Sequence, residues 1–146
     1  MPASSRFAVA IHVLTLMARS GDEPLKSEQV ALSVNTNPVV IRRILCGLQS
    51  AQLVTSQTGA TGGSRLARRP ERITLLEVYR AVGAGDIFSL HRQPPNRKCF
   101  VGMNIEAVLA GVLQEVSTSV ERVLAKITIA HVLERLEPCR PARKRK

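Results

Sequence analysis

The stretch from residue 27 to residue 68 constrains the fold more than any other part of the sequence. A short helix is expected over residues 27–34, with Ser27 as its N-cap, and a three-residue turn follows it. Asn37 and Pro38 then mark the start of a further helix, because Asn caps free backbone amides and Pro already has the φ angle of a first helical residue. Two helices joined by a tight turn predict a helix-turn-helix.

The helix that begins at Pro38 is expected to end near Ala51 and to have two different sides. Its buried side repeats at helical spacing and comprises Ile41, Ile44, Leu45 and Leu48. Its exposed side carries Arg42, which we expect to read bases, and Arg43, placed either beside it or on a phosphate. A helix fits the major groove of duplex DNA, and Arg is the side chain best shaped to bind guanine through two hydrogen bonds. The alternative is that both arginines only solvate an exposed helix face.

A hairpin is expected after this helix, with strands at residues 53–56 and 65–68 around a Gly-rich loop. Directly after a helix-turn-helix, such a hairpin is the candidate wing. Gly62 and Gly63 would let its tip approach a sugar-phosphate wall or a narrow minor groove, and Arg65 would follow it. The alternative is an ordinary flexible turn.

The flanking segments are mostly helical. A first helix, capped by Ser4 or Ser5, is expected to end at Gly21, and another, capped by Thr74, near Val82. We therefore expect a mainly α-helical fold with a small β-hairpin wing, in which a winged helix-turn-helix is joined to a long C-terminal dimerisation helix. The expected division of the chain is a winged helix-turn-helix DNA-binding domain at 1–83, a loop at 84–103, dimerisation helices at 104–137 and a basic disordered tail at 138–146.

The segment from about Asn104 repeats apolar residues at intervals of three or four, namely Ile105, Leu109, Val112, Val116, Val120 and Val123. This spacing is close to a coiled-coil seam, and a seam of this length in a small protein predicts a partner helix and hence a homodimer. A short last helix is expected from Thr128 to Leu136. No segment is expected to be long enough to span a bilayer, so no membrane partner is expected.

The charge of the chain indicates what it binds. It has 21 Lys and Arg residues against 11 Asp and Glu, a formal net charge of +10. Half of this excess lies in residues 1–72 and half in residues 138–146, which favours nucleic acid or, less specifically, a membrane surface. The tail would add nonspecific affinity for DNA or would simply be solvated. Because the chain has one Tyr, three Phe and no Trp, stacking on single strands is poorly supported, and double-stranded DNA is the expected partner.

Several motifs together resemble the Rrf2 (Rrf-two) family of IscR/NsrR-like regulators. They are the order of the elements, the stretch Asn37-Pro38-Val39-Val40-Ile41-Arg42-Arg43, Leu53-Val54 leading into a Gly-rich wing, and residues 73–82, and the likeness covers residues 4 to about 136. The resemblance implies a sequence-specific transcriptional regulator, more often a repressor than an activator, that binds a palindromic operator as a homodimer. The expected DNA-binding set is Ser4, Arg6, Ser27, Thr36, Asn37, Val39, Val40, Arg42, Arg43, Gly62, Gly63 and Arg65.

The best-studied members of that family hold an iron-sulfur cluster on three closely spaced cysteines, in a sensor region that corresponds to residues 84–103. This chain offers only Cys99 there, while Cys46 and Cys139 are far away in sequence, and a cluster needs several thiolates on its irons. We expect no cluster and no other cofactor or metal, so the chain resembles the cluster-free branch. Few, widely spaced cysteines also fit a reduced cytoplasmic protein.

Two of the cysteines are candidates for redox sensing. Arg97 and Lys98 precede Cys99, and nearby positive charge favours the thiolate; the alternative is a half-buried packing residue. Cys46 shares a helix face with Arg42, so its oxidation would disturb a DNA contact, although a cysteine in such a place is more often inert.

No nucleophile–base pair or carboxylate dyad is recognisable, so no enzymatic activity is expected. The other hypothesis is a basic structural nucleic-acid-binding protein without sequence specificity, which would have the same affinity for an operator as for random DNA. The sequence points to no particular effector.

Overall fold

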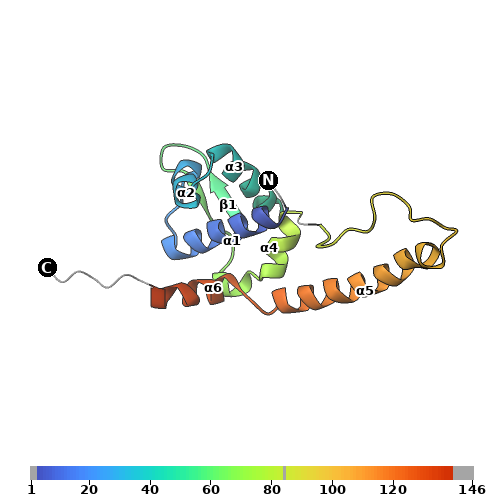
Figure 1. Cartoon of the computed structure of the whole chain (residues 1–146). Helices are drawn as coiled ribbons and strands as arrows, with labels where there is room; N and C mark the ends of the chain where they lie inside the picture. The colour runs from blue at the N-terminus through green and yellow to red at the C-terminus, as the bar shows by residue number, and fades with distance from the viewer. Residues whose placement is uncertain (1–2, 84, 140–146) are drawn as a thin grey trace.

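Helices make up most of the structure, a computed structural model that describes residues 3–83 and 85–139. In chain order the elements are α1 (Ala3–Ser20), α2 (Ser27–Val34), α3 (Pro38–Ser50), β1 (Val54–Gln57), β2 (Gly63–Leu66), α4 (Leu75–Ala81), α5 (Phe100–Leu124) and α6 (Ile129–Leu136), with 3-10 turns at Pro70–Arg72 and Glu137–Cys139. Figure 1 shows α1 to α4 and the hairpin clustered together, α6 beside them, and α5 extending away. The expected mainly helical fold with a small hairpin is confirmed.

Two of the expectations concern parts of the chain ends that the structure does not describe. The basic tail expected from residue 138 lies mostly outside the described residues, and so does the side chain of Ser4, an expected DNA contact. α1 already begins at Ala3, so Ser4 and Ser5 fall inside the helix, and the expectation that one of them caps it is wrong.

α1 lies at the centre of the cluster and packs against α2, α3, α4, α6 and the wing. Its buried side chains are Ala10, Val13, Leu14 and Met17. They meet the expected apolar stripe of α3, of which Ile41 and Leu48 are completely buried. Removal of this apolar surface from water is the main stabilising contribution to the fold.

α2 and α3 form the expected helix-turn-helix. Asn35 between them adopts the left-handed conformation with φ 61°, which ends α2 sharply. The side chain of Asn37 then caps α3 by accepting a hydrogen bond of 2.9 Å from a backbone amide of the first turn. The expected cap of α2 by Ser27 is wrong: Ser27 is the first helical residue, Lys26 is the N-cap, and the Gln29 side chain accepts a hydrogen bond of 2.8 Å from the Lys26 amide.

The hairpin is antiparallel, as expected, but its strands are displaced. β2 begins at Gly63, two residues before the expected start at Arg65. The reason is that the backbone of Leu25, which precedes α2, forms two hydrogen bonds with Ser64 (2.9 and 2.8 Å) and extends the pairing. A Cβ atom at Gly63 would lie 2.8 Å from the Leu25 carbonyl oxygen, so this close approach requires glycine.

α4 starts with a reciprocal cap, which confirms the expected role of Thr74. Its hydroxyl accepts a hydrogen bond of 3.2 Å from the Glu77 amide, and the Glu77 carboxylate accepts one of 3.1 Å from the Thr74 amide. Arg68, which follows β2, donates to the same carboxylate at 2.8 Å. The end of the wing is therefore fastened to α4.

α6 returns to this core after α5. The Leu75 amide donates to the Ile127 carbonyl at 2.8 Å, and the Ile129 amide donates to the Ile73 carbonyl at 2.9 Å. Ile129 is fully buried, and α6 packs against α1. The expected last helix after Thr128 is confirmed, but the segment 104–137 is not uniform, because α5 stands away from the core and α6 is part of it.

α5 begins at Phe100, four residues before the expected start at Asn104. Instead of opening the helix, the side chain of Asn104 donates a hydrogen bond of 2.7 Å to the Phe100 carbonyl one turn earlier. None of the side chains of α5 is buried against the chain. α5 has 25 residues, and an 18-residue window within it has a mean hydropathy of 1.2. By length and composition alone it is able to cross a membrane, which corrects the expectation that no segment is long enough.

Candidate nucleic-acid interface

A groove of about 500 Å³ separates α3 from the hairpin. Its walls come from the start of α2, one face of α3 and both strands. The groove is lined by, among others, Lys26, Ser27, Glu28, Arg42, Cys46, Gln49, Ser56, Gln57, Gly62 and Gly63. Four of the expected DNA-binding residues, Ser27, Arg42, Gly62 and Gly63, therefore line one open groove.

Arg42 is held in this groove by an acidic residue of α2. Its Nη2 donates a hydrogen bond of 2.6 Å to Oε1 of Glu28, and the two side chains remain 55% and 60% exposed. The hydrogen bond from its own backbone amide holds the pKa of Glu28 below its ordinary value, and the charge of Arg42 adds to this effect. The carboxylate thus stays ionised at neutral pH and orients the guanidinium, while the exposed remainder of the fork is available to a ligand.

Glu28 is the functional candidate that sequence reasoning missed. It lies 14 residues before Arg42, and no local spacing rule links the two positions. The packing of α2 against α3 brings them together.

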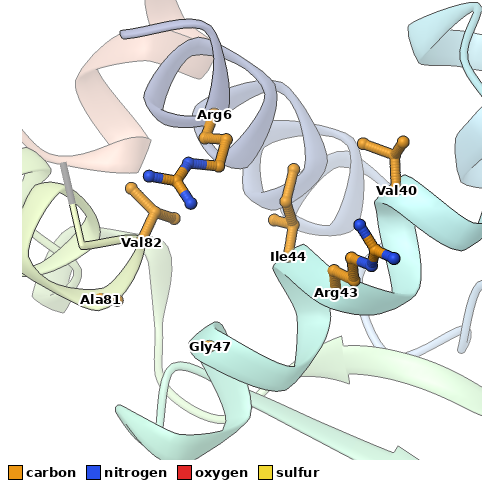
Figure 2. Close-up of a pocket in the computed structure, with 7 residues that line it drawn as sticks. All are labelled: Arg6, Val40, Arg43, Ile44, Gly47, Ala81 and Val82. Carbon is orange, nitrogen blue, oxygen red and sulfur yellow. The ribbon is translucent and has the colours of Figure 1, made fainter. Parts of the chain in front are cut away.

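Arg43 lies on a different side of α3 from Arg42. Successive residues of a helix are separated by about 100° of rotation, since one turn takes 3.6 residues. Arg43 accordingly faces a second cavity, of about 280 Å³, whose lining also includes Arg6 and Val40 (Figure 2). Three expected DNA-binding residues, Arg6, Val40 and Arg43, therefore gather away from the groove of Arg42.

The remaining candidates on α3 differ in exposure. Val39 is 47% exposed at the start of the helix, where it is free to touch a ligand. Thr36 is half-buried in the turn. The Asn37 side-chain oxygen already accepts the capping hydrogen bond, so its role in the fold is established while its expected DNA contact stays a prediction.

Arg65, the arginine of the wing, is not among the residues that line the groove. Arg65 lies on β2 opposite Thr55, and among the described residues its guanidinium has neither an ion pair nor a hydrogen bond. A Cβ at Gly62 would collide with the backbone of Gln57 on the opposite strand. Gly62 and Gly63 are thus required by the hairpin itself, and their expected closeness to DNA stays a prediction.

The cysteines differ in their surroundings. Cys46, on the groove face of α3, and Cys99, at the start of α5, are both exposed thiols in the single chain. The backbone amides of Gly102 and Val101 lower the pKa of the Cys99 thiol, because they favour its thiolate form. In residues 3–83 and 85–139 no three His, Cys, Asp or Glu side chains lie close enough to hold a metal ion, and these residues do not fit the thiolate set that an iron-sulfur cluster needs.

Comparisons with known proteins agree with this arrangement. The Rrf2 family, described as "Iron-dependent Transcriptional regulator", matches residues 3–135. YwnA of Bacillus subtilis (strain 168), named as an HTH-type transcriptional regulator, is 44% identical over 134 residues, covering 91% of this chain and 98% of that protein. A crystal structure of a protein described as DNA-binding is 40% identical with a TM-score of 0.71, covering 88% of this chain and 98% of that chain. T. potens IscR shares the fold with a TM-score of 0.71 at 23% identity, covering 94% of this chain and 90% of that chain.

Proposed function

We propose that this chain, which belongs to the Rrf2 family of DNA-binding transcriptional regulators, binds a palindromic operator as a homodimer and represses transcription there. Members of this family are regulators and not enzymes. The observation that carries the proposal is the groove between α3 and the hairpin, in which Arg42 is oriented by Glu28 and remains exposed.

In the proposed complex α3 enters the major groove and the hairpin lies along the flanking backbone. Arg42 would bind a guanine through two hydrogen bonds, and Val39 would touch a thymine methyl. Arg65 would reach a phosphate or the minor groove beside the wing. Lys26, Arg42 and Gln49 are among the residues that line the groove, and their polar groups support contact with a hydrated, charged partner.

The homodimer is proposed to form through α5. Its seam residues Val112, Val116 and Val123 are 49%, 37% and 57% exposed, and Ile105, Leu109 and Val120 continue the same stripe. A stripe with this spacing is typical of helices that pair. A membrane is the less favoured partner, because Glu106, Glu115 and Glu121 lie along the helix and charged residues are costly in a bilayer. We accordingly propose a cytoplasmic location.

The test is the affinity for a selected site relative to random DNA. Binding sites are selected from a pool of random duplexes, and the dissociation constants of the best site and of a scrambled duplex are measured at physiological salt. We expect the selected site to be palindromic and to bind about 1,000-fold or more tightly than the scrambled one. Equal affinities would favour the nonspecific structural binder instead.

We further propose that the chain uses no iron-sulfur cluster and that Cys99 responds to oxidants. A peroxide would take two electrons from the thiolate, leaving a sulfenic acid on Cys99 and releasing hydroxide. The exposed thiol and its lowered pKa support this assignment.

A pair of cysteine variants tests the sensor. Hydrogen peroxide is expected to release wild-type protein from the selected site, and Cys99→Ser is expected to remain bound under the same treatment, as measured by fluorescence anisotropy. Cys46→Ser serves as the matched control and should respond like the wild type. Release of Cys99→Ser by peroxide at the wild-type dose would exclude Cys99 as the sensor.

A further inference from the structure

A second cavity lies on the opposite side of α3 from the DNA groove. It is formed where the start of α1, the middle of α3 and the end of α4 meet, and its volume is about 280 Å³. Figure 2 shows Arg6 reaching down from α1 toward Val82, Arg43 at the side of α3, and Ile44 between them. A Cβ at Gly47 would lie 2.9 Å from the Ala81 carbonyl oxygen, so glycine allows α4 to close the floor of the cavity against α3.

The cavity is lined by apolar side chains and by two arginines. Its walls are apolar and come from Val40, Ile44, Ala81 and Val82. Its only charged groups are the guanidinium groups of Arg6 and Arg43, and within the described part of the chain neither forms an ion pair or a hydrogen bond. Two unpaired cations over an apolar wall favour a ligand that combines an anionic head with an apolar body.

The size of the cavity and its separation from the groove narrow the ligand further. About 280 Å³ is near the lower end of small-molecule sites, so the body must be compact. A DNA phosphate would use the arginines but leave the apolar wall without a partner. The cavity also shares no lining residue with the groove that holds Arg42.

We propose that this cavity binds a small carboxylate with a compact apolar body and that this ligand lowers the affinity for DNA. Arg6, whose guanidinium lies beside Val82, binds the carboxylate, while Arg43 adds positive charge on the other side of Ile44. Val40 and Val82 contact the hydrocarbon. Arg43 belongs to the helix that reads DNA, so a bound anion withdraws its charge and fixes α3 against α4. This second step rests on the proposed function, whereas binding of the carboxylate does not.

Binding is tested directly, without DNA, by isothermal titration calorimetry. The probes are hexanoate and benzoate, with acetate and inorganic phosphate as anions that lack an apolar body and benzamide as a neutral analogue. Saturable binding is expected for hexanoate or benzoate. Acetate and phosphate lack the apolar contact and benzamide lacks the charge-assisted hydrogen bond, so each is expected to bind at least about tenfold more weakly. No saturable binding of either apolar carboxylate, or equal binding of phosphate, would overturn the proposal.

Variants locate the site. Val82→Phe fills the cavity and is expected to abolish binding of the probe, with Val82→Met as a milder filler if the first lowers the melting temperature. Arg6→Gln should weaken binding about tenfold or more, since one charge-assisted contact is lost. Arg19→Gln removes an exposed cation from the same helix and should bind the probe like the wild type. Unchanged binding in folded Val82→Phe or Val82→Met would place the probe elsewhere and refute the assignment.

The regulatory step is measured separately on the selected DNA site. The probe is expected to lower the affinity of the wild type severalfold and to leave the affinity of Val82→Phe unchanged. If the probe binds but DNA affinity does not change, the regulatory half of the proposal is wrong and the binding site stands. Absence of specific DNA binding in the untreated wild type would instead refute the proposed function, so the two failures are distinguishable.

Discussion

Substitution of Val116 by Asp is expected to convert the proposed dimer into a monomer and to abolish tight binding to the selected site. In a two-fold pair of α5 helices the change removes two buried valines, each worth about 1.5–3 kcal/mol, and adds two unpaired charges. The dimer dissociation constant should therefore rise about 1,000-fold or more, which corresponds to about 4 kcal/mol. The single chain should keep its fold, because Val116 is 37% exposed and α5 has no buried side chain.

Analytical ultracentrifugation measures this change in buffer without lipid or detergent. Gln114→Asp is the matched control, since residue 114 is exposed and lies on the side of α5 opposite the seam. It introduces the same charge on the same helix and should leave the dimer intact. Persistence of the Val116→Asp dimer at micromolar concentration would show that α5 does not carry the interface.

Arg42→Ala is expected to weaken binding to the selected site by about 1–3 kcal/mol and to leave binding to random DNA nearly unchanged. The reason is that a guanidinium bound to a guanine edge contributes only where that base is present. Loss of the cation also leaves Glu28 without its ion-pair partner in the groove.

A second arginine gives the contrast. Arg65→Ala removes a free cation of the wing and should weaken specific and nonspecific binding by similar factors, with a smaller dependence of affinity on salt. Dissociation constants for both duplexes at several salt concentrations separate the two patterns. A uniform loss across sequences for Arg42→Ala would assign Arg42 to phosphate binding rather than base reading.

The helix-turn-helix could be predicted from the sequence because its signals are local. Asn37 and Pro38 define a helix start by their own chemistry, and Thr74 with Glu77 forms a capping box within one turn. The apolar stripe of α3 gives its buried side directly, and all four of its residues are buried. The fold class followed from these short-range rules.

Other features depend on contacts between residues distant in sequence. β2 starts early because Leu25 pairs with Ser64, and the ion pair between Glu28 and Arg42 depends on the packing of two helices. The return of α6 to the core depends on hydrogen bonds that connect residues 73–75 with residues 127–129. No window of neighbouring residues contains this information. The separation of Arg42 and Arg43, in contrast, follows from helix geometry alone and could have been predicted.

The two ends of α5 are held differently: the C-terminal end is bonded to the core, and the N-terminal end follows a loop. Its C-terminal end is pinned to the core by the hydrogen bonds on either side of Thr128 and by the ion pair of Arg80 with Glu121 (3.4 Å). Its other end, with Cys99, follows the loop that includes residues 85–99. A helix of 25 residues is about 37 Å long, so a rotation of about 5° at the pinned end displaces the far end by roughly 3 Å. A small tilt of α5 at its pinned end therefore changes the distance between Cys99 and the helix-turn-helix.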